Sequence, residues 1–179
     1  MSKTISEQAL ETAMKAQLGT VGPPQTEWQV AYPTEADKDK AVSKAWNDVA
    51  AKYSGSAEGI VAEFFLASRA ADAGNTAEAT KHFQNVVDNG SADYASLAKL
   101  ALAQLYGSQG KQAEGEKLLQ SIIDHPTTMV SKDAATIALG HLIAHSDPAR
   151  ARKLIEPLRA SQRTEVSQAA IRALADIPK

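Results

Sequence analysis

Residues 74–79 read Gly-Asn-Thr-Ala-Glu-Ala, and residues 110–115 read Gly-Lys-Gln-Ala-Glu-Gly. The two leading glycines are 36 residues apart, and a third copy, Ser-Asp-Pro-Ala-Arg-Ala, begins another 36 residues on, at Ser146. Each copy runs into apolar residues at helical spacing. A constant period of this length is typical of stacked helical hairpins, because one hairpin cannot bury its apolar face alone. The repeat therefore predicts an all-α array, a kind of protein that binds other proteins far more often than it catalyses.

The composition agrees with a helical array. The chain has 179 residues, of which 44% are hydrophobic and only 5% aromatic, so the core has to be built from Ala, Leu, Ile and Val. The formal net charge of −2 offers none of the basic surface that nucleic-acid-binding proteins use, and we expect no nucleic-acid partner. The chain has no cysteine, which excludes disulfides and thiolate metal sites but leaves the compartment open.

The repeat segment predicts three helical hairpins followed by a closing helix. Asn75 and Asp147 are suitable N-caps for the second helices of their hairpins, and Pro148 follows at the first helical position, where its missing N–H costs nothing. Pro157 predicts a kink or an early helix end. The predicted helices span about 57–73, 76–88, 92–108, 112–124, 131–145, 148–159 and 164–176.

Before the repeats, the pattern predicts two further helices, at about 6–18 and 37–53. The segment between them is irregular, because glycine and proline interrupt the helical spacing there. We therefore divide the chain into residues 1–37, which hold the N-terminal helix and the irregular proline-containing segment, and residues 38–179, which hold the repeat domain.

Trp28, Val30 and Tyr32 alternate within the irregular segment as they would in an extended chain. Two interpretations of the aromatic residues stay open. Trp28 and Tyr32 fold back and cover an apolar end of the array, since the ends of repeat arrays need capping. Alternatively, they occupy a groove or anchor a partner, as large aromatic side chains commonly do.

The second helices carry a pattern of small and large residues at fixed spacing. A leading glycine is followed by a small residue five positions later, a large apolar residue four beyond that and another apolar residue three further on. The matching residues are Gly74, Ala79, Phe83 and Val86, then Gly110, Gly115, Leu119 and Ile122, then Ala151, Ile155 and Leu158. This pattern resembles the tetratricopeptide repeat. The resemblance covers about residues 57–179 and implies a right-handed superhelix of helical hairpins with a closing C-terminal helix.

Three further runs resemble one bacterial branch of that family, which includes the ancillary translocon subunit and the Tol-Pal-associated division coordinator. The runs are Tyr32-Pro33-Thr34-Glu35, Leu102-Ala103-Gln104-Leu105-Tyr106 and Ile122-Ile123-Asp124-His125-Pro126-Thr127. Members of this branch have an N-terminal transmembrane helix and a periplasmic repeat domain. The resemblance implies a scaffold on the periplasmic side of the bacterial inner membrane, with the cytoplasm as the alternative. Residues 1–179 lack an apolar run of anchor length, so we expect no membrane contact by this segment and an anchor that precedes Met1.

In the family, fixed positions of the first helix of each hairpin line a concave groove that binds the partner. The resemblance implies that the groove is lined by Phe64, Ser68, Asp72, Leu100, Gln104, Ser108, Thr136 and Ile143. These positions lack the Lys, Arg and Asn that clamp a partner's terminal carboxylate, so we expect an apolar helix or extended segment as the ligand. The alternative is that apolar members such as Phe64 and Leu100 belong to the core.

Candidate chemistry is sparse, and we expect no catalytic residue, metal or cofactor. His141 and His145 are four residues apart on a predicted helix, but Leu142 stands where the zinc-protease motif has Glu, and no third ligand is evident. A solvated or capping pair near a helix C-terminus is the expected role. His82 and His125 have no partner in the sequence. Two alternatives stay open: a helical metal-binding or enzyme-associated domain that uses His141 and His145, and a self-assembly module or homo-dimer in which a second copy fills the groove.

Overall fold

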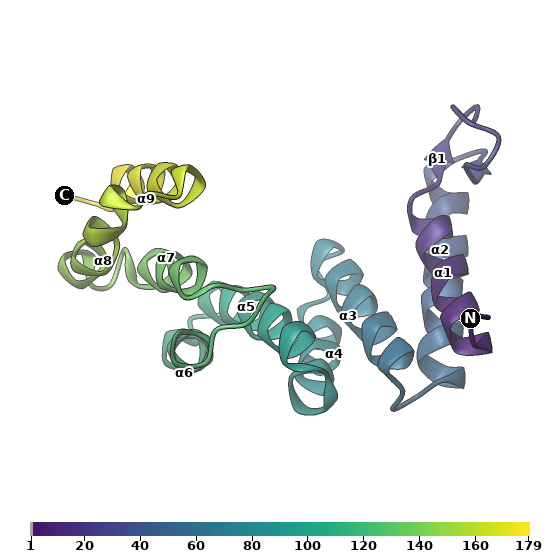
Figure 1. Ribbon diagram of the computed structural model, residues 1–179, viewed down its shortest axis with the longest axis horizontal. Coiled ribbons are helices and arrows are strands. Elements are labelled where there is room, and N and C mark those ends of the chain that lie inside the picture. Colours follow the sequence, from purple (N-terminus) through teal and green to yellow (C-terminus); the bar gives the residue numbers. More distant parts are fainter. Residues whose placement is uncertain (1) are drawn as a thin grey trace. The chain divides into compact units, whose positions relative to one another are not determined.

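The computed structural model describes residues 2–179 (Figure 1). Within this range the chain forms nine α-helices, one 3-10 helix and two short strands, and this confirms the predicted all-α repeat fold. The chain divides into two compact units, Met1–Gly90 and Ser91–Lys179. The division into residues 1–37 and 38–179, which the sequence pattern suggests, separates the repeat domain from the segment before it and stays a prediction.

The first unit contains α1 (Ile5–Gln17), α2 (Glu35–Lys52), α3 (Ala57–Asp72) and α4 (Thr76–Asn89). Each helix packs on the next one along the chain. Trp46 of α2 is completely buried, and its ring stacks on Phe65 of α3 with centroids 4.4 Å apart. Its indole N–H donates to Oε1 of Gln17 at 2.8 Å. One aromatic side chain thus joins three helices.

Side-chain caps account for where most of the helices begin. The Thr4 hydroxyl accepts from the N–H of Glu7, while the Glu7 carboxylate accepts from the N–H of Thr4, which is a complete capping box before α1. Ser56 caps α3 through a single side-chain hydrogen bond, without a reciprocal partner. Asn75 caps α4 and Asp147 caps the last hairpin's second helix, as predicted.

The chain between α1 and α2 forms a loop that extends beyond their ends (Figure 1). It contains the two-residue strands β1 (Thr20–Val21) and β2 (Ala31–Tyr32), which pair in parallel. Tyr32 is buried, and its hydroxyl donates to the carbonyl of Ala16 at 3.1 Å. Trp28 is 87% exposed. The prediction that both aromatic residues cover an apolar end is therefore wrong for Trp28, because the loop carries this side chain away from the helices.

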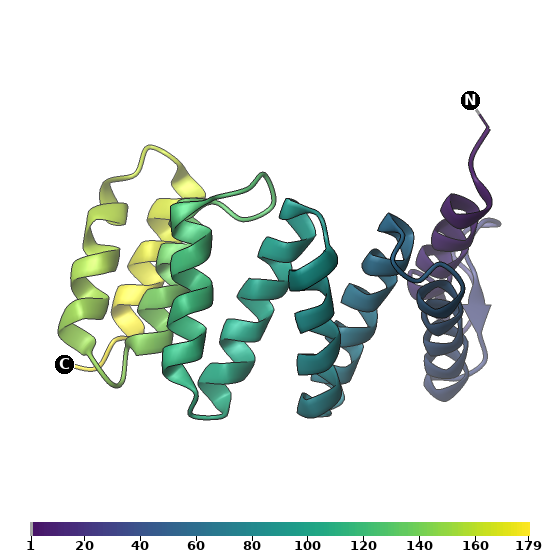
Figure 2. The ribbon, with the colours of Figure 1, turned by 90° about the horizontal axis from the view of Figure 1, so that it is seen from below.

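The second unit contains α5 (Ala92–Ser108), α6 (Gln112–Asp124), α7 (Lys132–Ile143), α8 (Pro148–Ile155), the 3-10 helix η1 (Glu156–Ala160) and α9 (Thr164–Asp176). Figure 2 shows these helices running side by side, with α9 (yellow) against α7. As predicted, α8 ends before Pro157, because proline cannot donate the backbone hydrogen bond that continues an α-helix. The closing helix predicted at 164–176 is present with the same bounds.

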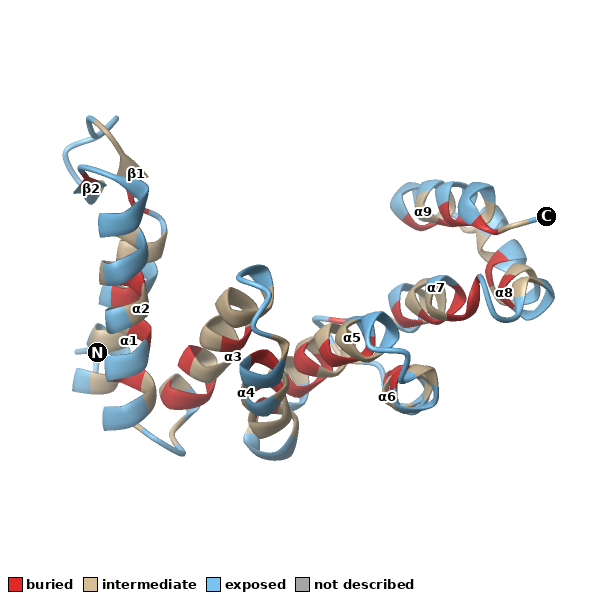
Figure 3. Ribbon diagram, turned by 180° about the vertical axis from the view of Figure 1, so that it is seen from behind, coloured by how far each residue is buried: buried red, intermediate tan, exposed pale blue. Residues whose placement is uncertain are grey.

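Buried apolar side chains and small residues hold the second unit together. Figure 3 shows that the buried residues of α7, α8 and α9 lie where these helices face one another. A Cβ atom added at Gly115 would lie 3.0 Å from Leu142 and 3.1 Å from the carbonyl oxygen of Ala103. One added at Gly140 would lie 2.3 Å from Ile155. Both glycines thus allow helices to approach more closely than a larger residue would permit.

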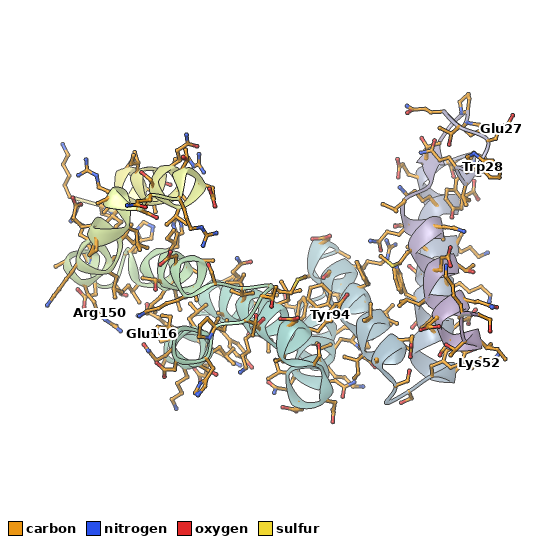
Figure 4. The ribbon with its side chains drawn as sticks, in the orientation of Figure 1. Glu27, Trp28, Lys52, Tyr94, Glu116 and Arg150 are labelled. Carbon is orange, nitrogen blue, oxygen red and sulfur yellow. The ribbon has the colours of Figure 1, made fainter. Side chains whose placement is uncertain are left out.

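A polar contact connects α6 with α8 on the surface of this unit. Arg150 donates to the carboxylate of Glu116 at 2.8 Å, and Figure 4 labels both residues. Gln112 also donates to this carboxylate, at 3.0 Å. The hydrogen bond from Gln112, followed by the contact with Arg150, lowers the pKa of Glu116. The charged form of this carboxylate is therefore the one that the fold favours.

We predict that Leu119→Ala costs about 2–5 kcal/mol of unfolding free energy, because its fully buried side chain fills the space between α6 and its neighbours. Ile171→Ala is the matched control, since Ile171 is 52% exposed on α9 and should change stability little. Urea denaturation followed by circular dichroism measures both. Equal stability of the Leu119 variant and the parent would show that this position is not part of the core.

Candidate functional site

An apolar groove of about 680 Å³ lies within the second unit, between α5 and α7. We call it the α5–α7 groove. Its walls come from one face of each helix, because the lining residues recur at intervals of three and four. The lining consists of Leu100, Ala103, Gln104 and Gly107 from α5, Leu119 from α6, and Ala134, Ile137, Ala138, His141, Leu142 and His145 from α7 and the turn that follows.

The groove lining contains no Asp, Glu, Lys or Arg. Its polar side chains are Gln104, His141 and His145, all of which are exposed. Aliphatic side chains such as Leu100 and Ile137 are half-buried and form the walls. The groove therefore offers an apolar surface with a few hydrogen-bonding groups, which is the usual composition of a binding site.

The structure places two of the predicted groove residues, Leu100 and Gln104, in this groove. Two others from the same unit lie outside its lining. Ser108 is exposed, and its hydroxyl donates to the carbonyl of Leu105 at 2.7 Å. Thr136 is half-buried, and its hydroxyl donates to the carbonyl of Lys132 at 2.8 Å. Both hydroxyls thus hydrogen-bond to their own helix.

Ile143 was predicted to line the groove but is completely buried, so it belongs to the core. It lies in one apolar cluster with Ala170 and Ala173 of α9. The reason is that α9 packs on α7 and covers this side of the helix. As the first helix of the last hairpin, α7 thus presents only its α5-facing side as a groove wall.

Phe64, Ser68 and Asp72 belong to the first unit and do not form an apolar groove there. Phe64 packs edge-on against Phe65 and Phe83, with ring centroids 5.8 and 5.7 Å apart. The Ser68 hydroxyl donates to the carbonyl of Phe64 at 3.0 Å. Asp72 is exposed and lines a separate pocket of about 510 Å³, together with polar residues of α2, α3 and α4.

Two of the histidines line the groove, which the sequence analysis did not predict. His141 and His145 both face the α5–α7 groove. The signal that could have found them is the helical spacing that they share with Ala134, Ile137 and Ala138. Among residues 2–179, no group of three or more His, Asp and Glu side chains could hold a metal ion.

His82 has two partners in the structure, although the sequence predicted none. Its Nδ1 atom pairs with the carboxylate of Glu63 on α3, and its Nε2 atom lies 3.5 Å from the carboxylate of Glu78 on α4. The imidazole thus connects the two helices of the first hairpin. Glu63 is 19 residues away in the sequence, so only the antiparallel pairing of α3 and α4 brings it to His82.

The chain is built from helical hairpins that pack through small residues, and a groove lies between successive first helices. These features define a helical repeat protein. A family model described as a tetratricopeptide repeat-like domain matches residues 25–166. The chain belongs to this family. The match begins before α2 and so includes a helix that the resemblance over residues 57–179 left out. Searches of curated proteins and of solved structures give no significant match. None of the helices in residues 2–179 has both the length and the apolar character needed to cross a membrane.

We predict that groove and core positions respond differently to a charge. Leu100→Glu should keep the helical content and lose about 1–2 kcal/mol of stability, because a half-buried wall residue can turn its carboxylate toward water. Ile143→Glu should unfold the second unit, because it buries an unpaired charge. Circular dichroism and urea denaturation of the two variants measure the difference. Unfolding of both would place Leu100 in the core.

Proposed function

We propose that this chain is a non-enzymatic scaffold that binds an apolar helical or extended segment of a partner protein in the α5–α7 groove. The family suggests protein–protein interaction as the role of the repeats. The observation that carries the proposal is the uncharged, apolar lining of a groove between two first helices. Such a lining favours an apolar segment over a charged terminus, because the groove has no Asp, Glu, Lys or Arg side chain that could form an ion pair with that terminus.

The dimensions and polar groups of the groove support this kind of ligand. Its volume of about 680 Å³ lies within the range of roughly 300–1,000 Å³ that is common for binding pockets. Burial of apolar surface on its walls contributes about 25 cal/mol per Å². Gln104, His141 and His145 supply hydrogen bonds that can orient the backbone or a polar side chain of the bound segment.

The carboxyl groups whose pKa the fold lowers lie outside the α5–α7 groove. Within residues 2–179, the carboxyl groups with a lowered pKa are Glu11, Glu116 and Glu165. Each of them pairs with a Lys or Arg on the surface, and none lines the groove.

We predict that a photo-crosslinking amino acid at Gln104 captures a partner protein from cells that express the native gene, and that one at Gln120 does not. Both glutamines are exposed, but Gln120 lies on α6 outside the groove. Mass spectrometry of the crosslinked peptide should identify an apolar segment. In the protein that carries the crosslinking residue in place of Gln104, the additional substitution Leu100→Glu should abolish the crosslink. Equal crosslinking at both positions would argue against the groove as the binding site.

The finer part of the proposal is that the scaffold works on the periplasmic side of the bacterial inner membrane, in protein translocation, a periplasmic chaperone network or cell division. The support is the resemblance of residues 32–35, 102–106 and 122–127 to the membrane-anchored branch of the family. We predict that a tagged native gene product is digested by protease added to spheroplasts. Protection until the inner membrane is lysed would indicate the cytoplasm instead.

A further inference from the structure

Residues 25–30 form an exposed turn in the loop between β1 and β2, which we call the Trp28 turn. The N–H of Gln29 donates to the carbonyl of Thr26 at 3.2 Å, so Glu27 and Trp28 occupy the two central positions of a β-turn. The side chain of Gln29 accepts from the N–H of Gln25 at 3.0 Å. Figure 4 shows Glu27 and Trp28 at the tip of the loop. The turn is thus held by its own hydrogen bonds.

Trp28 is the most exposed of the large apolar side chains in residues 2–179, at 87%. Leu18 and Val30 are also exposed. They lie on neighbouring stretches of chain, because the N–H of Thr20 donates to the carbonyl of Val30 at 2.9 Å. A group of exposed apolar residues with a tryptophan at its tip is typical of an interaction site.

The α5–α7 groove is chemically complementary to this turn. A buried indole N–H needs an acceptor, and the Gln104 side chain or a neutral imidazole provides one. Glu27 has no ion-pair partner within the described part of the chain. The imidazole N–H groups of His141 and His145 can donate to its carboxylate, in hydrogen bonds that the charge strengthens.

We propose that the Trp28 turn of one copy of this chain binds in the α5–α7 groove of a second copy. The inference rests on the groove proposed above and identifies one of its ligands. The turn loses little conformational entropy on binding, because its hydrogen bonds already hold it in shape. Because the turn and the groove are different surfaces, the contact is heterologous and adds copies head to tail. An occupied groove is closed to the partner segment, so self-association competes with partner binding.

Sedimentation velocity over a dilution series of the full chain tests the proposal. We expect the sedimentation coefficient to rise with concentration. Acrylamide quenching of tryptophan fluorescence should fall in parallel, as the indole enters the groove. The chain has two tryptophans, and Trp46 is completely buried, so quenching reports on Trp28.

Two single variants should each weaken self-association at least about tenfold, by removing one side of the contact. Trp28→Ala removes the turn's anchor and Leu100→Glu charges the groove. Ile171→Ala, another exposed apolar position, is the matched control and should leave association unchanged. A mixture of the two disrupted variants should form dimers and nothing larger, because one variant retains a groove and the other retains a turn. Gln104→Lys replaces Leu100→Glu if the latter does not fold.

A monomer at all concentrations would overturn the proposal, and so would association that survives Trp28→Ala. A monomer in which Trp28 is shielded from acrylamide would also overturn it, because the turn would then bind within its own chain. The crosslinking at Gln104 separates this result from a failure of the proposed function. If Gln104 still captures a partner in a chain that does not self-associate, only the self-association proposal fails, whereas no capture and no association would reject both.

Discussion

Close approach of helices at small residues is the constraint on which the second unit depends. A Cβ atom at Gly140 would lie 2.3 Å from Ile155, and one at Gly107 would lie 2.7 Å from Leu142. Leu142 also packs against Gly115. One leucine of α7 thus contacts glycines of both helices of the preceding hairpin. This contact sets the separation of α5 and α7, and with it the width of the groove between them.

The same packing explains where the groove ends. Each hairpin in such an array leaves one side for the next hairpin to cover. In the second unit α9 covers that side of α7, which places Ile143 in the core and leaves the α5-facing side open. The closing helix therefore limits the binding surface as well as protecting the core from water.

The loop between α1 and α2 buries one of its two aromatic side chains and exposes the other. Tyr32 is buried next to Gly19, and its hydroxyl reaches the end of α1. Trp28 lies four residues earlier, at the tip of a turn that holds it in water. The loop thus stabilises the first unit through one ring and leaves the other available for an intermolecular contact. If the groove accepts both a partner segment and the Trp28 turn of another copy, the two ligands compete. A groove that holds the turn would then bind the partner only after self-association is lost.

The amino-acid sequence by itself determined the repeat, the approximate helix bounds and the caps at Asn75 and Asp147. Asn75, Asp147 and Pro157 acted as predicted, because capping and helix termination depend on hydrogen bonds within a single turn of the chain. Leu100 and Gln104, which the family resemblance assigns to a partner-binding groove, line the α5–α7 groove, and their contact with a partner stays a prediction.

Only the tertiary structure decided which apolar and imidazole side chains are covered. Ile143 is buried because α9 returns to it, and His82 is paired because α3 brings Glu63 to it. Trp28 is exposed because its turn points away from the helices, although its sequence pattern is that of Tyr32. Whether a residue is buried depends on which distant segment packs against it. The periodicity of a single helix does not predict that segment.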